Sequence, residues 1–523
     1  MTSPQADTDK DEAALRRVFG HNFVDWILAT DGRPARSQQQ RKVAALVYQE
    51  SQRATPEGAK TPAFLRLSRW TGMNPQTGRT FLTDLRRMAG GIEPVLPNPP
   101  EDEVLAALQA WAAENFGGLL LGESGFSLGW GGQAREQMTK AIAADSAFPF
   151  NTDSASSDAL FHITTVGNAE GLQLAMLGPG IVAAAFRAAA TRNPSPSVED
   201  LLGELSGAIG TARAVYAGST VPTLALAGLA GVLLPEEKQE IMAPWGRIRV
   251  AYETDNVWLD KQQDLTTMLL EDGSQLVSRG TGDLTIEMTL PWSAQFIEDN
   301  TAGDAQRSGP TTSANILHRR ILDVRLGFAL AMNDPQVPAL LPTWEKIESP
   351  IADAGGFSMT ELGRLRQRTP TRLSVEQAEA WELWIAALDG LALENLGHAP
   401  QRLLRAITER QDPVDALVDA VIVWEAIFGT HSEITFRVCG SLARLLCSTV
   451  DERLAFVKEA KGIYGMRSKI VHGASGIRPE KIHASRDEAV HVAIRTLRAL
   501  VQDRPDLLAI ADSGKRSERI MLE

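Results

Sequence analysis

Helical periodicity from residue 316 to residue 503 is the feature that most limits what this chain can fold into. Apolar residues recur there every three or four positions, which places them on one face of successive α-helices. The predicted helices cover residues 316–332, 374–395, 400–410, 415–428, 433–447, 449–472 and 486–503. Amphipathic helices joined by loops bury their apolar faces against one another, so we expect an α-helical bundle over residues 314–510.

The preceding 300 residues are more varied. Residues 1–91 are predicted to form a helical domain, which a proline-rich linker from Ile92 to Pro100 separates from the rest. Residues 101–235 predict a mixed, mostly helical region. Residues 236–300 contain short β-like runs with Asp-Gly and Gly-Thr-Gly-Asp turns, which predict a small β-rich module. The expected fold class is therefore mainly α, with a β-rich module in the middle.

The segment from Leu67 to Leu82 faintly resembles a helix-turn-helix. Gly72 would occupy the turn, and Thr77 and Arg79 would lie on the outer face of the second helix. A plain helical hairpin whose turn needs a glycine explains the same residues and is the favoured interpretation.

Charge and composition limit the partners. The chain has 65 acidic residues against 52 Lys and Arg, a net charge of −13, which argues against broad charge-driven binding of nucleic acid but permits a confined RNA site. Its longest apolar run, Val221 to Leu234, is shorter than the roughly 20 residues of a membrane span. We expect a cytoplasmic protein without a membrane partner. The sequence contains no metal-ligand cluster, and we expect no cofactor.

An arginine five residues before a histidine is the sequence pattern that best suits a catalytic site. Arginine can bind a phosphate, and histidine can transfer a proton near neutral pH. The pattern occurs at Arg16/His21, Arg467/His472, Arg478/His483 and Arg486/His491. Spacing alone cannot choose among these pairs. Pro479 predicts a loop after Arg478. Arg486 and His491 form the competing pair, with Arg486 expected in the first turn of the last helix.

The surroundings of Arg467 and His472 favour that pair. Thr449 and Glu452 form a capping box that starts their helix. The stem of Arg467 is drawn toward the core, so its guanidinium needs a partner, and Glu425 on the preceding apolar helix is the candidate. Glu433 could join the same network. The alternative is a purely structural Arg–Glu brace.

The residues from Tyr464 to Gly473 read Tyr-Gly-Met-Arg-Ser-Lys-Ile-Val-His-Gly. This sequence motif resembles the Arg-x4-6-His signature of HEPN domains, in particular that of the ApeA-like branch. The resemblance covers roughly residues 316–505. It implies a HEPN-type bundle and metal-independent RNA cleavage at the cleft of a homodimer. In that family the signature arginine and histidine carry out the cleavage.

Carried onto this chain, the resemblance implies that Arg467 binds the scissile phosphate and that Ser468 helps to position it. His472 would be the general acid or base, giving 2′,3′-cyclic phosphate and 5′-hydroxyl ends. Tyr464 and Glu425 would support the site. The resemblance further implies phage defence or toxin-like growth arrest, with tRNA or another RNA as substrate and a phage-derived trigger or an antitoxin as partner.

Two alternatives remain open at this stage: a non-catalytic HEPN module that binds RNA or protein, and a DNA-binding regulator that uses Leu67 to Leu82. Helix geometry adds one constraint on the leading hypothesis. Residues five apart differ by about 140° around a helix axis, so Arg467 and His472 of one chain point in different directions. We therefore expect a homodimer that pairs the two 449–472 helices and completes the site across the cleft.

Overall fold

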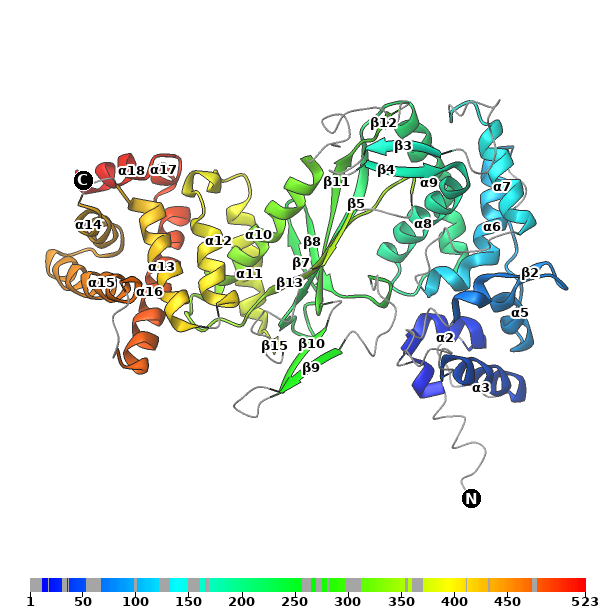
Figure 1. Ribbon diagram of the computed structural model, residues 1–523, viewed down its shortest axis with the longest axis horizontal. Helices are drawn as coiled ribbons and strands as arrows, with labels where there is room; N and C mark the ends of the chain where they lie inside the picture. The colour runs from blue at the N-terminus through cyan, green and yellow to red at the C-terminus, as the bar shows by residue number, and fades with distance from the viewer. Residues whose placement is uncertain are drawn as a thin grey trace, which may run out of the picture.

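A computed structural model describes residues 12–16, 18–30, 35, 37–52, 67–97, 101–121, 132–148, 160–164, 169–255, 265–269, 275–279, 282–297, 312–352, 356–359, 370–410, 412–430, 433–472 and 477–523. The described structure is mainly helical, as expected (Figure 1). N-terminal helices and a C-terminal group of helices lie at opposite ends, with a β-sheet between them (Figure 1).

The central sheet has six antiparallel strands in the order β14-β13-β5-β11-β8-β7. They are β5 (Val221–Ala230), β7 (Glu240–Ala243), β8 (Gly246–Val250), β11 (Leu284–Trp292), β13 (Leu341–Ile347) and β14 (Gly356–Met359). The predicted module of residues 236–300 thus supplies only part of the sheet. β5 lies in the region predicted to be mostly helical. It is buried along most of its length and so lacks the alternation that marks a half-exposed strand.

The remaining strands are short. They are β1 (Met73–Asn74) with β2 (Arg79–Thr80), β9 (Leu265–Leu269) with β10 (Gln275–Arg279), β6 (Val232–Leu233) with β15 (Thr371–Arg372), and β3 (Leu160–Thr164) between β4 (Ala169–Gln173) and β12 (Gln295–Ile297). β6 and β15 pair in parallel, and the other pairs are antiparallel.

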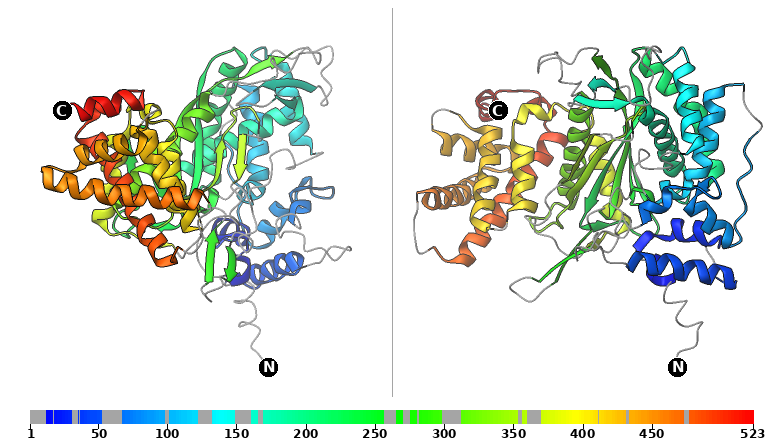
Figure 2. Two further views of the ribbon diagram at one scale, coloured as in Figure 1. Left: turned by 60° about the vertical axis from the view of Figure 1, so that its left-hand side comes forward. Right: turned by 45° about the vertical axis from the view of Figure 1, so that its right-hand side comes forward.

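Helices cover both faces of the central sheet. α8 (Leu174–Arg192) and α9 (Val198–Tyr216) lie on one side, and α10 (Thr312–Met332) and α11 (Val375–Leu388) lie on the other (Figures 1 and 2). α6 (Glu103–Leu120) and α7 (Gln133–Ala144) pack outside α8 and α9. Among the described helices, α8 is long and apolar enough to cross a membrane by length and composition, and 67% of its apolar window is buried inside the structure.

α10 and α11 belong to two hydrophobic cores at once. Val324 and Trp381 pack in the core of the sheet layers, whereas Leu330 and Leu388 pack in the core of the C-terminal helices. The indole of Trp381 donates a hydrogen bond of 3.0 Å to the carbonyl of Val324 and joins the two helices. The α10–α11 pair therefore contributes side chains to both hydrophobic cores.

In the described part of the chain, seven α-helices of the C-terminal bundle pack beyond this helix pair. They are α12 (Ala399–Leu404), α13 (Pro413–Phe428), α14 (Ile434–Leu446), α15 (Val450–Val471), α16 (Pro479–Gln502), α17 (Pro505–Leu508) and α18 (Ser513–Met521). α18 lies beyond the predicted boundary at residue 510. It is anchored by the fully buried Arg516, which donates to the carbonyls of Leu507 and Ile427 at 3.0 and 2.6 Å. Burial lowers the pKa of Arg516 to about 10.

The helix-turn-helix interpretation of residues 67–82 is wrong, and so is the helical hairpin. β1 and β2 form a hairpin where the second helix was expected, and α5 (Phe81–Met88) begins only after it. Gly78 in the turn has φ +70°. Asp84 accepts hydrogen bonds from Asn74 and Thr77 at 2.7 and 2.8 Å, so local side-chain bonds stabilise the turn instead of a helix. α2 (His21–Leu28), α3 (Gln38–Gln52) and α5 share a small separate core.

Arg213 on α9 ties α6 and α7 together and makes stability depend on pH. It donates to Asp102 at 2.7 Å, and this hydrogen bond lowers the pKa of Asp102, which also caps α6. A carboxyl whose folded pKa is depressed stabilises above its unfolded pKa of about 4, and this contribution is lost as the pH falls through the folded value. We expect Arg213→Gln to lower the free energy of unfolding by about 1 kcal/mol at pH 7 and by less below about pH 4.

Urea denaturation at the two pH values measures this effect. The matched control is Arg192→Gln, because Arg192 pairs with Glu204 but its side chain is 74% exposed. An Arg213→Gln deficit of equal size at both pH values would contradict the linkage.

Candidate functional site

α15 carries the Arg467/His472 pair and begins as predicted. The Thr449 side chain accepts a hydrogen bond from the Glu452 backbone N–H at 3.3 Å, and the Glu452 carboxylate accepts from the Thr449 N–H at 3.0 Å. This capping box satisfies N–H groups that lack a partner within the helix. At the other end His472 is the C-cap residue. Gly473 lies outside the described residues.

Glu425 on α13 is the centre of the candidate site. Arg467 Nη2 lies 3.5 Å from Glu425 Oε2, and the Tyr464 hydroxyl donates to Glu425 Oε1. The two charged side chains are 24% and 25% exposed. Burial, followed by the hydrogen bond to Glu425, raises the pKa of Tyr464, so its hydroxyl stays protonated and donates at neutral pH. Tyr464 and Arg467, which follow Glu425 by 39 and 42 positions in the sequence, thus both contact its carboxylate.

Arg467 is anchored but retains unused hydrogen-bonding capacity. Its Nε is buried and has no hydrogen-bond partner in the described structure, and its contact with Glu425 is an ion pair rather than a short hydrogen bond. A guanidinium offers five N–H donors. An incoming anion could therefore bind Arg467 without displacing Tyr464 from Glu425.

The His472 side chain makes no described contact with Glu425, Tyr464 or Arg467. It is exposed, and the backbone N–H of His472 donates to the carbonyl of Ser468 at 3.1 Å. Ser468 is half-buried. No bond links Arg467 to His472 among the described residues, which agrees with the angular offset between them on the helix.

Glu433 does not join the network. It is exposed at the N-cap of α14, where its φ of +52° puts it in the left-handed region, and it makes no side-chain cap hydrogen bond. Of the predicted site residues, the structure brings together Glu425, Tyr464 and Arg467. The sequence predicted Glu425 as the partner of Arg467 and Glu433 as a further member of the network, and the structure contains the first of these contacts.

The competing pair lies in a setting different from the one predicted. α16 begins at Pro479, so Arg486 is well inside the helix and not in its first turn. Proline suits the first helical position because its fixed φ matches the helix and no N–H is lost. The Arg486 side chain is 15% exposed and lies 2.8 Å from Asp487. His491 is half-buried, and His483, predicted to lie in a loop, is on the same helix.

An exposed apolar surface on α14 and α15 is a feature that sequence analysis missed. Phe436, Val450, Leu454 and Val471 are 54%, 68%, 66% and 55% exposed. Within the chain the buried face of α15 consists instead of Ala460, Ile463, Tyr464 and Met466. We call Phe436, Val450, Leu454 and Val471 the α15 surface.

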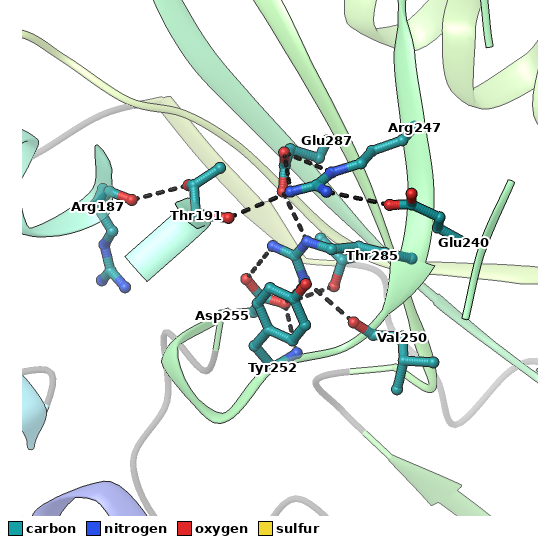
Figure 3. A network of polar contacts seen from close by, with 10 residues as sticks. Arg187, Thr191, Glu240, Arg247, Val250, Tyr252, Asp255, Thr285 and Glu287 are labelled. Carbon is teal, nitrogen blue, oxygen red and sulfur yellow. Dashed lines mark hydrogen bonds and ion pairs between the residues drawn. The ribbon is translucent and has the colours of Figure 1, made fainter. Parts of the chain in front are cut away.

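A second cluster of charged side chains is buried in the sheet (Figure 3). Arg249 on β8 forms a fork of 2.6 and 2.8 Å with Asp255, and its Nε donates to Glu287 at 2.6 Å. Burial alone lowers the pKa of Arg249, but these bonds outweigh it and the pKa is raised. Arg247 also donates to Glu287, at 2.9 Å. The charges are mutually paired, which makes this cluster a brace between strands rather than a reactive site.

The brace continues into the N-terminal helices. Asp255 accepts a hydrogen bond of 2.8 Å from the Tyr252 N–H, which shapes the turn that carries Glu253. Glu253 in turn accepts from the His21 and Asn22 N–H groups at the start of α2, at 2.8 and 3.2 Å. A carboxylate from the 3-10 turn after β8 (Glu253–Asp255) thus replaces the side-chain cap that Gly20 cannot supply.

The described residues contain no group of three or more His, Cys, Asp or Glu side chains that could hold a metal ion. Comparison with known proteins gives no match: no protein-family model, curated protein or solved structure is significantly similar to this chain.

The Glu425 cluster can be tested through stability. Glu425→Ala leaves the Arg467 guanidinium and the Tyr464 hydroxyl without their shared acceptor, and we expect the free energy of unfolding to fall by about 1–3 kcal/mol. The matched control is Glu433→Ala, because Glu433 is exposed and outside the cluster; we expect a change within about 0.5 kcal/mol. Urea denaturation measures both. Equal effects of the two variants would show that Glu425 does not hold the cluster.

Proposed function

We propose that this chain is a metal-independent endoribonuclease of the HEPN type. Arg467 binds the scissile phosphate, and His472 is the general acid or base. The observation that carries the proposal is the anchoring of Arg467 by Glu425, with guanidinium donors left unused, close to the end of a helix that presents an exposed histidine.

The chemistry needs only these groups and the RNA. A neutral imidazole at His472 accepts the proton of a ribose 2′-hydroxyl, and the 2′-oxygen attacks the adjacent phosphorus. The bond from phosphorus to the 5′-oxygen breaks, and that oxygen takes a proton from the imidazolium formed at His472 or from water. Arg467 stabilises the charge that builds on the phosphoryl oxygens, and Ser468 helps to position the phosphate. The products carry a 2′,3′-cyclic phosphate and a 5′-hydroxyl.

The proposal includes a homodimer formed through α15. The α15 surface supports it, because large apolar side chains that are exposed at both ends of α15 and on the neighbouring α14 usually face a partner. A second copy that covers this surface brings two Arg467/His472 pairs into one cleft, which relieves the angular offset within one chain. Nuclease site and dimer contact then lie on the same helix.

In this proposal the enzyme acts in the cytoplasm in phage defence or toxin-like growth arrest, on tRNA or another cellular RNA. The N-terminal regions receive a phage-derived trigger or hold the enzyme inactive, and an antitoxin is a further partner. The DNA-binding alternative loses its geometric basis, because residues 73–80 form a hairpin. The non-catalytic HEPN alternative is an outcome of the experiment below.

RNA cleavage in the presence of EDTA tests the nuclease proposal. We expect wild type to cut RNA, and Arg467→Ala and His472→Ala each to lower the rate by about 100-fold or more, since each removes a group that acts on the reacting atoms. The matched control is His491→Ala, which we expect to retain the wild-type rate. Product ends are read by their sensitivity to cyclic phosphodiesterase and kinase treatment.

Three outcomes are informative. Cleavage that His491→Ala alone abolishes would move the site to the competing pair. Intact RNA with wild type and His472→Ala alike, both alone and with phage-infected cell extract, would support the non-catalytic module. Activity that EDTA removes would contradict the metal-independent mechanism.

Light scattering tests the dimer. Leu454→Glu places a charge on the α15 surface, and we expect it to convert a dimer of about 113 kDa, twice the 56.6 kDa chain, into a monomer. Leu383→Glu is the matched control, because Leu383 is 71% exposed but lies on α11. A wild-type monomer that cleaves RNA would contradict the dimer proposal and leave the assignment of Arg467 intact.

A further inference from the structure

A small cavity of about 260 Å³ lies between α16 and the segment that follows α10. It is lined by Pro335, Gln336, Val337, Ala339, Ile407, His483 and Arg486. The cavity lining therefore contains the arginine of the competing pair Arg486/His491 and the histidine of the pair Arg478/His483. Neither residue has a role in the proposed nuclease site.

The charge of this lining is one-sided. Among the described residues that line it, His483 and Arg486 are the titratable ones, and both can carry positive charge. Carboxylates near the lining already have partners: Asp487 lies 2.8 Å from Arg486, Asp334 accepts a hydrogen bond of 2.8 Å from the Gln336 N–H, and Glu409 lies 3.0 Å from Arg325. An anion in the cavity would meet cationic groups and no opposing carboxylate in its walls.

Arg486 is held loosely for an arginine that is largely buried. Its Nη1 reaches the Pro335 carbonyl at 3.5 Å, the limit of a hydrogen bond, and its Nε is buried without a partner. Its ion pair is with its own neighbour in the sequence, Asp487. A buried donor without an acceptor is unfavourable, so the guanidinium gains a missing acceptor where it turns toward an anion in the cavity.

Hydrogen bonds from Arg325, which is outside the lining, hold two segments of the cavity lining in position. Arg325 on α10 donates to the Leu340 carbonyl at 3.1 Å, which fixes the end of one wall. The same guanidinium donates to Thr408 at 3.1 Å and to Glu409 at 3.0 Å in η6 (Arg405–Glu409), a π-helical turn that carries Ile407. Because these contacts exist without ligand, little ordering is needed for binding.

We propose that this cavity binds a phosphate group through Arg486 and His483. Its volume lies below the roughly 300–1,000 Å³ typical of drug-sized ligands, which suits inorganic phosphate or the phosphate of a mononucleotide. The guanidinium fork matches two phosphate oxygens, and the exposed histidine adds a third donor from the same helix. The bound anion connects α16 of the bundle to the segment that leads into β13 of the sheet.

Isothermal titration of the full-length chain with inorganic phosphate, and separately with adenosine 5′-monophosphate, tests the site. We expect saturable binding, weakened about tenfold or more in Arg486→Gln and also weakened in His483→Gln. Arg478→Gln is the matched control, because Arg478 is exposed at the start of α16 and outside the lining. Tighter binding of the nucleotide identifies it as the source of the phosphate, and tighter binding of inorganic phosphate identifies the free ion.

Arg467→Ala separates this site from the proposed nuclease site. It is expected to bind phosphate as wild type does even though RNA cleavage is lost, so either proposal can fail alone. Binding that Arg467→Ala abolishes and Arg486→Gln leaves unchanged would overturn the inference, as would the absence of saturable binding up to about 10 mM. His483→Gln changes an exposed side chain, so its loss of binding remains readable even where Arg486→Gln affects folding.

Discussion

The packing of α10 against α11 is the contact on which the rest of the structure depends. Each helix buries one side in the sheet core and another in the bundle core, and the Trp381 indole links them through the Val324 carbonyl. Gly327 lets the helices approach closely, since a Cβ there would lie 3.2 Å from the side chain of Ile385. Because each helix packs apolar side chains into both cores, the pair joins the two cores.

The α10–α11 pair also positions the polar side chains around it. Arg325 projects from α10 to the π-helical turn before α13, and Arg486 reaches from α16 to the segment after α10. α13 in turn supplies Glu425, which anchors Arg467. The nuclease site that we propose and the cavity that we propose for phosphate therefore depend on one framework but use different side chains. At the other end, the paired charges around Arg249 extend the framework to α2 through Glu253.

Much of the bundle could be predicted from local pattern. The capping box at Thr449 and the apolar stripe of α13 are short-range features, and the structure contains both. The expected partner of Arg467 is also present, because a guanidinium drawn toward the core needs a partner and Glu425 stands beside the apolar stripe of α13. Local pattern failed for β5, whose strand is apolar on both faces, and for residues 73–80, where hydrogen bonds to Asp84 favour a hairpin.

The sequence by itself determined the mainly helical character, the beginning of α15, and the choice of Arg467 with Glu425, because these follow from periodicity and from the cost of burying an unpaired charge. Only the tertiary structure decided which apolar side chains of α15 stay exposed, because burial depends on which helices lie alongside. The same reason explains why Arg486 and His483 line one cavity. Their meeting with residues 335–339 joins segments about 150 positions apart in the chain, and no local pattern encodes contacts over that separation.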